Sequence, residues 1–160
     1  MDMGNMAGNS DPRARAEDVA CFLINMAQHS NNPVSNLKLQ KLLYYAYAWF
    51  LTETGHRLFG DRIKAWKHGP VVPCVYQEYR QFGSAPIGEA QRVVELDHDV
   101  QAHLESIWED FGPESALSLM QMTHNEDPWI EASNRAAETG EKSVPISDEA
   151  IVRYFRTLAA

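Results

Sequence analysis

The stretch SNLKLQKLLYYAYAWFLTETG, residues 35–55, is the most informative part of this sequence because it reads as one long helix with almost no polar side. Apolar residues recur at helical spacing on one side, and the opposite side is also apolar or aromatic. A helix of this kind is buried on most sides. With Ser35 as N-cap and Gly55 as the stop, we predict a buried central helix that carries Lys38 and Lys41 in its first turns.

The segments around this helix predict a mostly α fold: a single compact helical domain around the buried central helix, with a small extended or hairpin corner. An earlier helix is expected to begin near Asp11 and Pro12 and to run to about residue 29. Residues 56–66 alternate enough to suggest an extended segment or hairpin, and 68–73 read as a turn. Further helices are expected at 71–82, 97–112, 113–124, 127–134 and 147–158, with Asp97, Asp127 and Ser147 as N-caps and residues 135–143 as a polar loop.

The composition is that of a globular protein, with 160 residues, 44% of them apolar and 22% charged. We predict a disordered N-terminal lead at residues 1–10 and one domain over 11–160. The two cysteines, Cys21 and Cys74, give neither a disulfide framework nor zinc-ligand spacing, which favours a cytoplasmic protein. The longest uncharged stretch in the middle of the chain, residues 42–52, is too short to span a bilayer.

The charge is unevenly distributed. The formal net charge is −8, which argues against general nucleic-acid binding, and residues 93–134 contain ten acids and no Lys or Arg. This acidic region is either a solvated face or a face that steers a basic partner, with Asp99, Glu105 and Glu109 as its representatives. A DNA-linked regulator remains an alternative through one possible basic patch, made of Lys38, Lys41, Arg62, Lys64 and Lys67.

Two histidine clusters are considered as possible catalytic or metal-binding sites. His68 could act as a base for Cys74, but the spacing is not diagnostic and no oxyanion-hole motif follows. His124, with Glu126 and Asp127 nearby, could belong to a metal or acid/base site, yet helix capping explains that segment more simply. We therefore expect no catalytic, cofactor-binding or metal-binding residue. The alternative is a small-ligand or hydrolytic pocket that unites His68 and His124, lined also by Trp66 and Trp129.

Three motifs in this order resemble one protein family: SNLKLQKLLYYAYAWFL, then LFGDRIKAWKHGPVVPCVY, then MQMTHNEDPW, in which Met122 stands where a leucine is usual. The family is that of the Panacea-domain, SocA-like antitoxins, also described as phage-associated GepA-like proteins. The resemblance runs from about residue 14 to 154. Its motif residues here are Lys38, Gln40, Lys41, Tyr44, Tyr45, Trp66, His68, Gly69, Pro70, Pro73, Tyr76, His124, Pro128 and Trp129.

The resemblance implies a non-enzymatic, cytoplasmic antitoxin, encoded beside a toxin or carried on phage or prophage, that binds and neutralises a cognate protein toxin. It also implies that one branch acts as a proteolytic adaptor that delivers its toxin to the ClpXP protease. Because such a domain serves many toxins, we expect the shared motifs to be scaffold first and partner groove second. Two surfaces are then expected to bind the toxin: a short helix with Tyr76, Tyr79 and Arg80, and the acidic helix with Asp99, Glu105 and Glu109.

Overall fold

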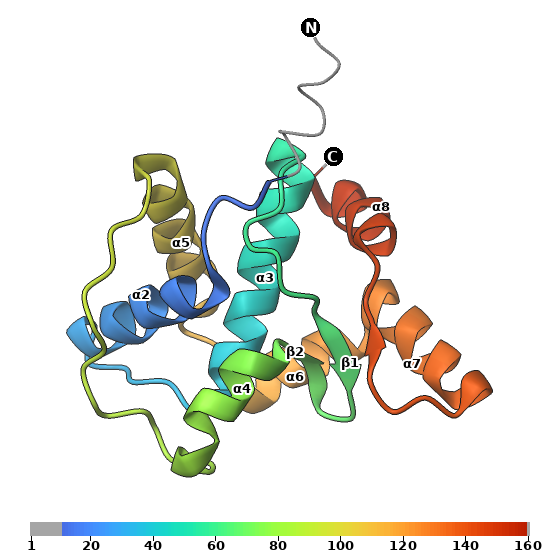
Figure 1. Cartoon of the computed structure of the whole chain (residues 1–160), viewed down its shortest axis with the longest axis horizontal. Helices are drawn as coiled ribbons and strands as arrows, with labels where there is room; N and C mark the ends of the chain where they lie inside the picture. Colours follow the sequence, from blue (N-terminus) through green and yellow to red (C-terminus); the bar gives the residue numbers. More distant parts are fainter. Residues whose placement is uncertain (1–10, 160) are drawn as a thin grey trace, which may run out of the picture.

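A computed structural model describes residues 11–159, so the predicted lead at residues 1–10 lies outside the described residues. This part of the chain is mostly helical, with seven α-helices and one small three-stranded antiparallel sheet (Figure 1). The predicted fold class is confirmed. The elements, in chain order, are α2 (Ala16–His29), α3 (Asn36–Thr54), β1 (Lys64–Trp66), β2 (Gly69–Val71), α4 (Pro73–Tyr79), the 3-10 turn η1 (Arg80–Phe82), α5 (His98–Phe111), α6 (Ala116–His124), α7 (Asp127–Thr139), β3 (Val144–Pro145) and α8 (Asp148–Ala159).

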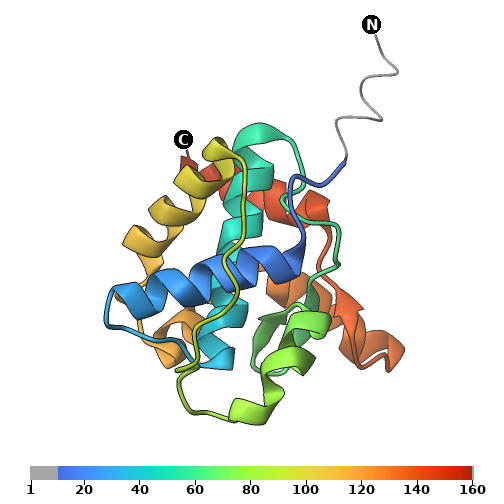
Figure 2. The ribbon, with the colours of Figure 1, turned by 60° about the vertical axis from the view of Figure 1, so that its left-hand side comes forward.

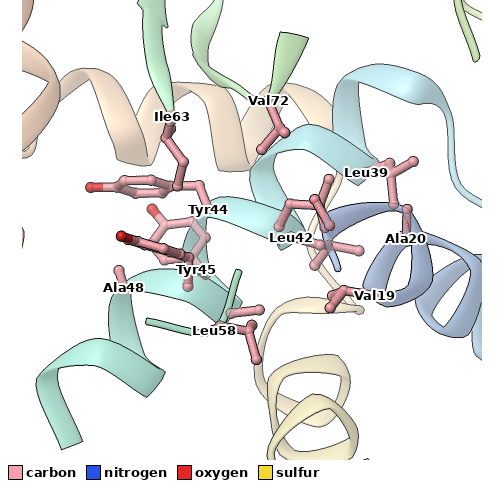
Figure 3. Packing of buried hydrophobic residues seen from close by; sticks show 14 of the residues in the cluster. Val19, Ala20, Leu39, Leu42, Tyr44, Tyr45, Ala48, Leu58, Ile63 and Val72 are labelled. Atoms are coloured by element: carbon pink, nitrogen blue, oxygen red, sulfur yellow. The ribbon is translucent and has the colours of Figure 1, made fainter. Parts of the chain in front are cut away.

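The central helix is α3, and its predicted ends are confirmed. The Ser35 side chain accepts a hydrogen bond from the Lys38 amide at 3.2 Å, and Gly55 ends the helix in the left-handed conformation at φ 77°. Most of its side chains are buried on all sides. Figure 3 shows Leu39 and Leu42 of α3 beside Val19 and Ala20 of α2, in one continuous apolar core.

The other helices surround α3. Figure 1 places α2 and α5 on one side of it and α7 and α8 on the other, and α6 also contacts it. The start of α8 is held by Asp148, which accepts hydrogen bonds from the Tyr47 hydroxyl at 2.6 Å and from Arg57 at 2.9 Å. The Phe155 ring of α8 packs edge-on against aromatic rings of α3. In this way the helix predicted from one stretch organises the whole core.

The extended corner is confirmed, but its boundaries differ from the prediction. Strand β1 pairs antiparallel with β2 in the register Lys64 to Val71 and Trp66 to Gly69, so the turn is at residues 67–68 and β2 occupies the predicted turn. Strand β3 pairs with the other edge of β1; it lies between the predicted loop at 135–143 and the predicted helix at 147–158, where no element was predicted. Both edge strands contain a proline. Proline is tolerated in an edge strand because the backbone N–H that it lacks is not needed for pairing with a further strand.

Three predicted helix ends were wrong. Helix α2 begins at Ala16 rather than near Pro12, because the amides of Arg13 and Ala14 bond to the carbonyls of Arg57 and Leu58 instead. Helix α7 begins at Asp127, so Glu126 rather than Asp127 occupies its N-cap position, and the helix continues into the predicted loop as far as Thr139.

The two other predicted N-caps, Asp97 and Ser147, differ in their hydrogen bonds. Asp97 occupies the N-cap of α5, but its carboxylate pairs with Arg13 rather than with the helix amides. Ser147 caps α8 as predicted, accepting a hydrogen bond from the Ala150 amide at 3.0 Å.

A segment without regular structure links η1 to α5 and crosses α2, as Figure 2 shows. Side chains of α2 hold it: Gln28 donates to the carbonyls of Ile87 and Glu89, and Asn25 bonds to the backbone of Gln91. Within residues 11–159, no helix has the length and apolar character required to cross a membrane.

Candidate functional site

The first two sequence motifs meet through a chain of buried side-chain amides. The Gln40 Oε1 atom accepts a hydrogen bond from the Val72 amide at 2.9 Å, and its Nε2 donates to Asn36 Oδ1 at 2.9 Å. Asn36 in turn donates to the Tyr76 carbonyl at 3.1 Å. Both amide side chains are buried, so these bonds satisfy groups that would otherwise be costly to place there. They fix the start of α4 against the first turns of α3.

The Lys41 side chain is fully buried at the same junction. Its Nζ donates to the Pro70 carbonyl at 3.2 Å, and burial lowers its pKa to about 7. Gly69 lies directly against it with φ 112°, and a Cβ atom there would be 2.5 Å from Lys41 Cε and 3.0 Å from Thr123 Oγ1. Position 69 therefore requires glycine for two reasons, the backbone conformation and the close approach of Lys41.

Glu126 brings the third motif to α3. Its carboxylate is buried and accepts hydrogen bonds from the Tyr45 hydroxyl at 2.7 Å and from the Tyr44 hydroxyl at 3.5 Å. Burial raises the pKa of Glu126 to about 7, although the two tyrosine bonds act in the opposite direction. The paired tyrosines of the first motif therefore serve as the hydrogen-bond donors for the acid at the N-cap position of α7.

Trp129 completes the junction from the side of α7. Its indole Nε1 donates to the Trp66 carbonyl at 2.9 Å, and its ring stacks on His124 with centroids 4.2 Å apart. Pro128 is buried in the first turn of α7. Burial lowers the pKa of His124, so the stacked imidazole is held in its neutral form near pH 7. The three motifs thus bind one another around α3.

An open groove of about 410 Å³ lies beside this junction. The Trp66 and Tyr76 rings form one wall, edge to face with centroids 5.1 Å apart. The predicted motif or contact residues that line it are Gln40, Trp66, His68, Tyr76 and Arg80, and the others are Asn36, Leu37, Lys67, Val71, Gly83 and Ser84.

No hydrogen bond among the described residues links His68 to Cys74 or to His124, although His68 is near enough to help lower the pKa of His124. His68 lines the groove, whereas His124 is not among the lining residues, so the two imidazoles do not share it. The Cys74 thiol donates to Asp61 at 3.1 Å, and burial together with this carboxylate raises its pKa to about 12, far from that of an activated nucleophile. Among the described residues, no three His, Cys, Asp or Glu side chains are placed to hold a metal ion.

The predicted basic patch is wrong in two of its five members, because Lys38 and Lys41 are buried. Lys38 places its Nζ over the Trp108 ring, 5.4 Å from the ring centroid, and donates from the same atom to the Gly112 carbonyl at 2.5 Å. Gly112 is the C-cap of α5, where the helix dipole favours a cation. The ammonium groups of both α3 lysines therefore bond to backbone carbonyls inside the fold.

The two predicted contact surfaces also change. Tyr79 is only 3% exposed and its hydroxyl donates to Gln91 at 3.0 Å, so the expectation that it is a surface anchor is wrong. Asp99 is exposed but paired with Arg13 at 2.8 Å, which holds the pKa of that carboxyl below its usual range. Glu105 and Glu109 on α5 and Arg80 after α4 are exposed as expected.

Sequence reasoning gave too little weight to Asn36, Leu37, Thr123 and Glu126. Asn36 and Glu126 stand at helix starts, where a polar residue is usually explained by capping. Their tertiary partners lie 40 or more positions away, so no local pattern shows them. The signal available was the proximity of Glu126 to His124 and Trp129 in the third motif.

Comparison with known proteins places this geometry in context. Residues 39–130 match the family model described as antitoxin SocA-like, Panacea domain. The antitoxin SocA of Caulobacter vibrioides (strain NA1000 / CB15N) is 31% identical over 162 aligned positions, covering 91% of this chain and 85% of that protein. No solved structure matches this chain significantly. The matched range includes all three motifs apart from the start of the first.

The close approach at Gly69 gives a testable prediction. Gly69→Ala should lower the free energy of unfolding by about 1–2 kcal/mol for the left-handed backbone, and by a further ~1–3 kcal/mol for overlap with Lys41. Gly140→Ala is the matched control, because Gly140 has φ 79° with no atom near an added Cβ. Urea unfolding of the two variants measures the difference. Equal losses in both would show that the Lys41 contact contributes nothing.

The buried Glu126 carboxyl predicts a pH dependence. Its pKa rises from 4.5 to about 7 on folding, so the native state keeps a proton that the unfolded chain releases between these values. The unfolding free energy should fall across that window, by at most about 3 kcal/mol. Glu126→Gln should remove this fall while it keeps an acceptor for Tyr45.

Urea unfolding at about pH 5 and about pH 6.5 checks this, because Lys41 stays mainly protonated over that range. Exposed Glu149, changed to Gln, serves as the control. The same pH slope in the wild type and in Glu126→Gln would contradict the expectation.

Proposed function

Because this chain belongs to the antitoxin SocA-like, Panacea-domain family, we propose that it is a non-enzymatic antitoxin that binds and neutralises a cognate protein toxin in the cytoplasm. The observation that carries the proposal is the 31% identity to antitoxin SocA across 91% of the chain. The Cys74 environment and the separation of His124 from the groove give no support to the hydrolytic alternative.

The shared motifs act in this proposal as scaffold. Gln40, Lys41 and Glu126 are buried, and their polar atoms form hydrogen bonds with other parts of the fold. A protein that must present a stable face to its partner gains from such internal bonds, because a buried polar group with fixed partners favours one packing arrangement. Toxin contact then belongs to exposed side chains around that scaffold.

Two faces remain for the toxin. The first is the groove with Tyr76 and Arg80, and the second is the exposed acidic face of α5 with Glu105 and Glu109. Glu105 also lines an apolar hollow of about 310 Å³, together with Phe22, Met26 and Val93. Val93 is 90% exposed, so this acidic face combines charge with apolar surface.

Co-expression tests the proposal as a whole. We expect a tag on this chain alone to purify the product of the adjacent gene in a fixed ratio, and that product to stop growth when made alone. A harmless neighbour that does not copurify would reject the antitoxin function.

We also propose that toxin binding leads to degradation by ClpXP, as the resemblance implies. The toxin should then disappear more quickly when this chain is present, and only in cells that contain ClpXP. Measurement of toxin lifetime after synthesis is blocked, with and without ClpXP, separates delivery from masking. A bound toxin with an unchanged lifetime would establish masking.

The acidic face predicts an effect on association rate. Reversal of Glu105 and Glu109 to Lys should slow association with the toxin on the order of tenfold at low salt, because steering by opposite charge is lost. The matched control is Glu138→Lys with Glu149→Lys, which changes the net charge equally at exposed positions elsewhere. Stopped-flow measurements at low and moderate salt give the rates. Equal rates for the two double variants would remove α5 from the interface.

A further inference from the structure

We propose that the groove beside the motif junction binds an acidic segment of the toxin, in which carboxylates flank an apolar side chain. This inference rests on the proposed function and specifies the chemistry of the partner. The groove is the 410 Å³ hollow lined by Trp66, Tyr76, Arg80 and Lys67.

The charge of the groove is opposite to that of the protein. The chain has a formal net charge of −8, yet no Asp or Glu lines the groove. Lys67 and Arg80 are exposed on its rim, and among the described residues neither has an ion-pair partner. Five other arginines, by contrast, are paired with carboxylates. A local cationic site on an acidic protein is complementary to an acidic ligand and repels basic ones.

The apolar wall of the groove is already in place. The Trp66 indole Nε1 donates to Ser143 Oγ at 3.0 Å, and its carbonyl accepts the bond from Trp129. The Tyr76 ring packs edge-on against Trp66, and the carbonyl of Tyr76 is held by Asn36. Because these rings are fixed before binding, a ligand does not have to order them.

Several side chains that line the groove can donate hydrogen bonds to a ligand. The Tyr76 hydroxyl has no hydrogen-bond partner among residues 11–159, and it lies in the same hollow as Lys67 and Arg80. Arg80 can hold a carboxylate with two parallel bonds, and Lys67 can act as a point charge. Half-buried Leu37 adds an apolar contact. Together these groups favour carboxylates placed around one apolar side chain.

Nucleic acid is the competing ligand for a groove of cations and aromatic rings. The net charge and the burial of Lys38 and Lys41 leave few cations to follow a phosphate backbone, so we favour the peptide. Single-stranded oligothymidylate is therefore included in the test as a competitor.

The first experiment uses the full chain and two fluorescein-labelled peptides. One alternates glutamate with leucine and phenylalanine, and the other has lysine in place of every glutamate. Fluorescence anisotropy should show the acidic peptide binding at least about tenfold more tightly, with an affinity that falls as salt rises. Equal affinity for both peptides, or displacement of the acidic one by oligothymidylate at lower concentration than by unlabelled peptide, would overturn the proposal.

The variants locate the binding in the groove. Arg80→Glu should remove the preference for the acidic peptide, and Tyr76→Phe should weaken it by a few-fold through loss of the hydroxyl donor. Arg156→Glu is the matched control, because Arg156 is exposed on α8 and makes no ion pair within the described residues. An equal loss in Arg80→Glu and Arg156→Glu would assign the effect to net charge and reject the groove.

The toxin provides the second readout. Arg80→Glu should fail to copurify the toxin and to restore growth, whereas Arg156→Glu should do both. If the wild type neutralises the toxin and Arg80→Glu does so equally well, the groove proposal fails and the antitoxin function stands. If the wild type itself binds no neighbour, the antitoxin function fails, and the peptide preference still decides whether the groove selects acidic ligands.

Discussion

The whole structure depends on how the buried polar side chains at the start of α3 are satisfied. Gln40 and Lys41 are buried in the central helix α3, where an unpaired amide or ammonium would be strongly destabilising. Their partners are backbone groups of Val72 and Pro70, in and just after β2. The hairpin must therefore lie against α3 in one position, and Gly69 provides the space for it. This requirement sets the position of α4 and of the groove.

A buried acid, Glu126, connects other elements to α3 in a similar way. Glu126 occupies the N-cap position of α7 and accepts hydrogen bonds from Tyr44 and Tyr45, so α7 is attached to the middle of α3. Trp129, one turn later, bonds to the strand that carries Trp66. Through Trp66 and Tyr76, the groove wall is consequently connected to three segments distant in sequence, which are α7, α3 and the loop at Ser143. A surface built in this way keeps its shape while its exposed side chains vary, which suits a protein whose role is to bind a partner.

The helices and the family resemblance could be predicted because both depend on local signals. The apolar period, Ser35 and Gly55 defined α3, and three ordered motifs indicated the family before any contact was known. Predictions failed where a distant partner took over a local role. Arg13 takes the Asp97 carboxylate away from the α5 amides, and the amides of Arg13 and Ala14 bond to Arg57 and Leu58 instead of starting α2. Short polar segments contain no sign of such partners.

What this sequence determined by itself is the set of elements with strong periodicity and the three ordered motifs that indicate the family. Burial of individual polar residues was decided by tertiary structure alone. Lys41 and Tyr79 look like surface residues in a linear reading, yet the fold encloses both, whereas Arg80, next in the chain, is exposed beside the groove. The physical reason is that burial depends on which elements cover a side chain, and packing between distant segments settles that.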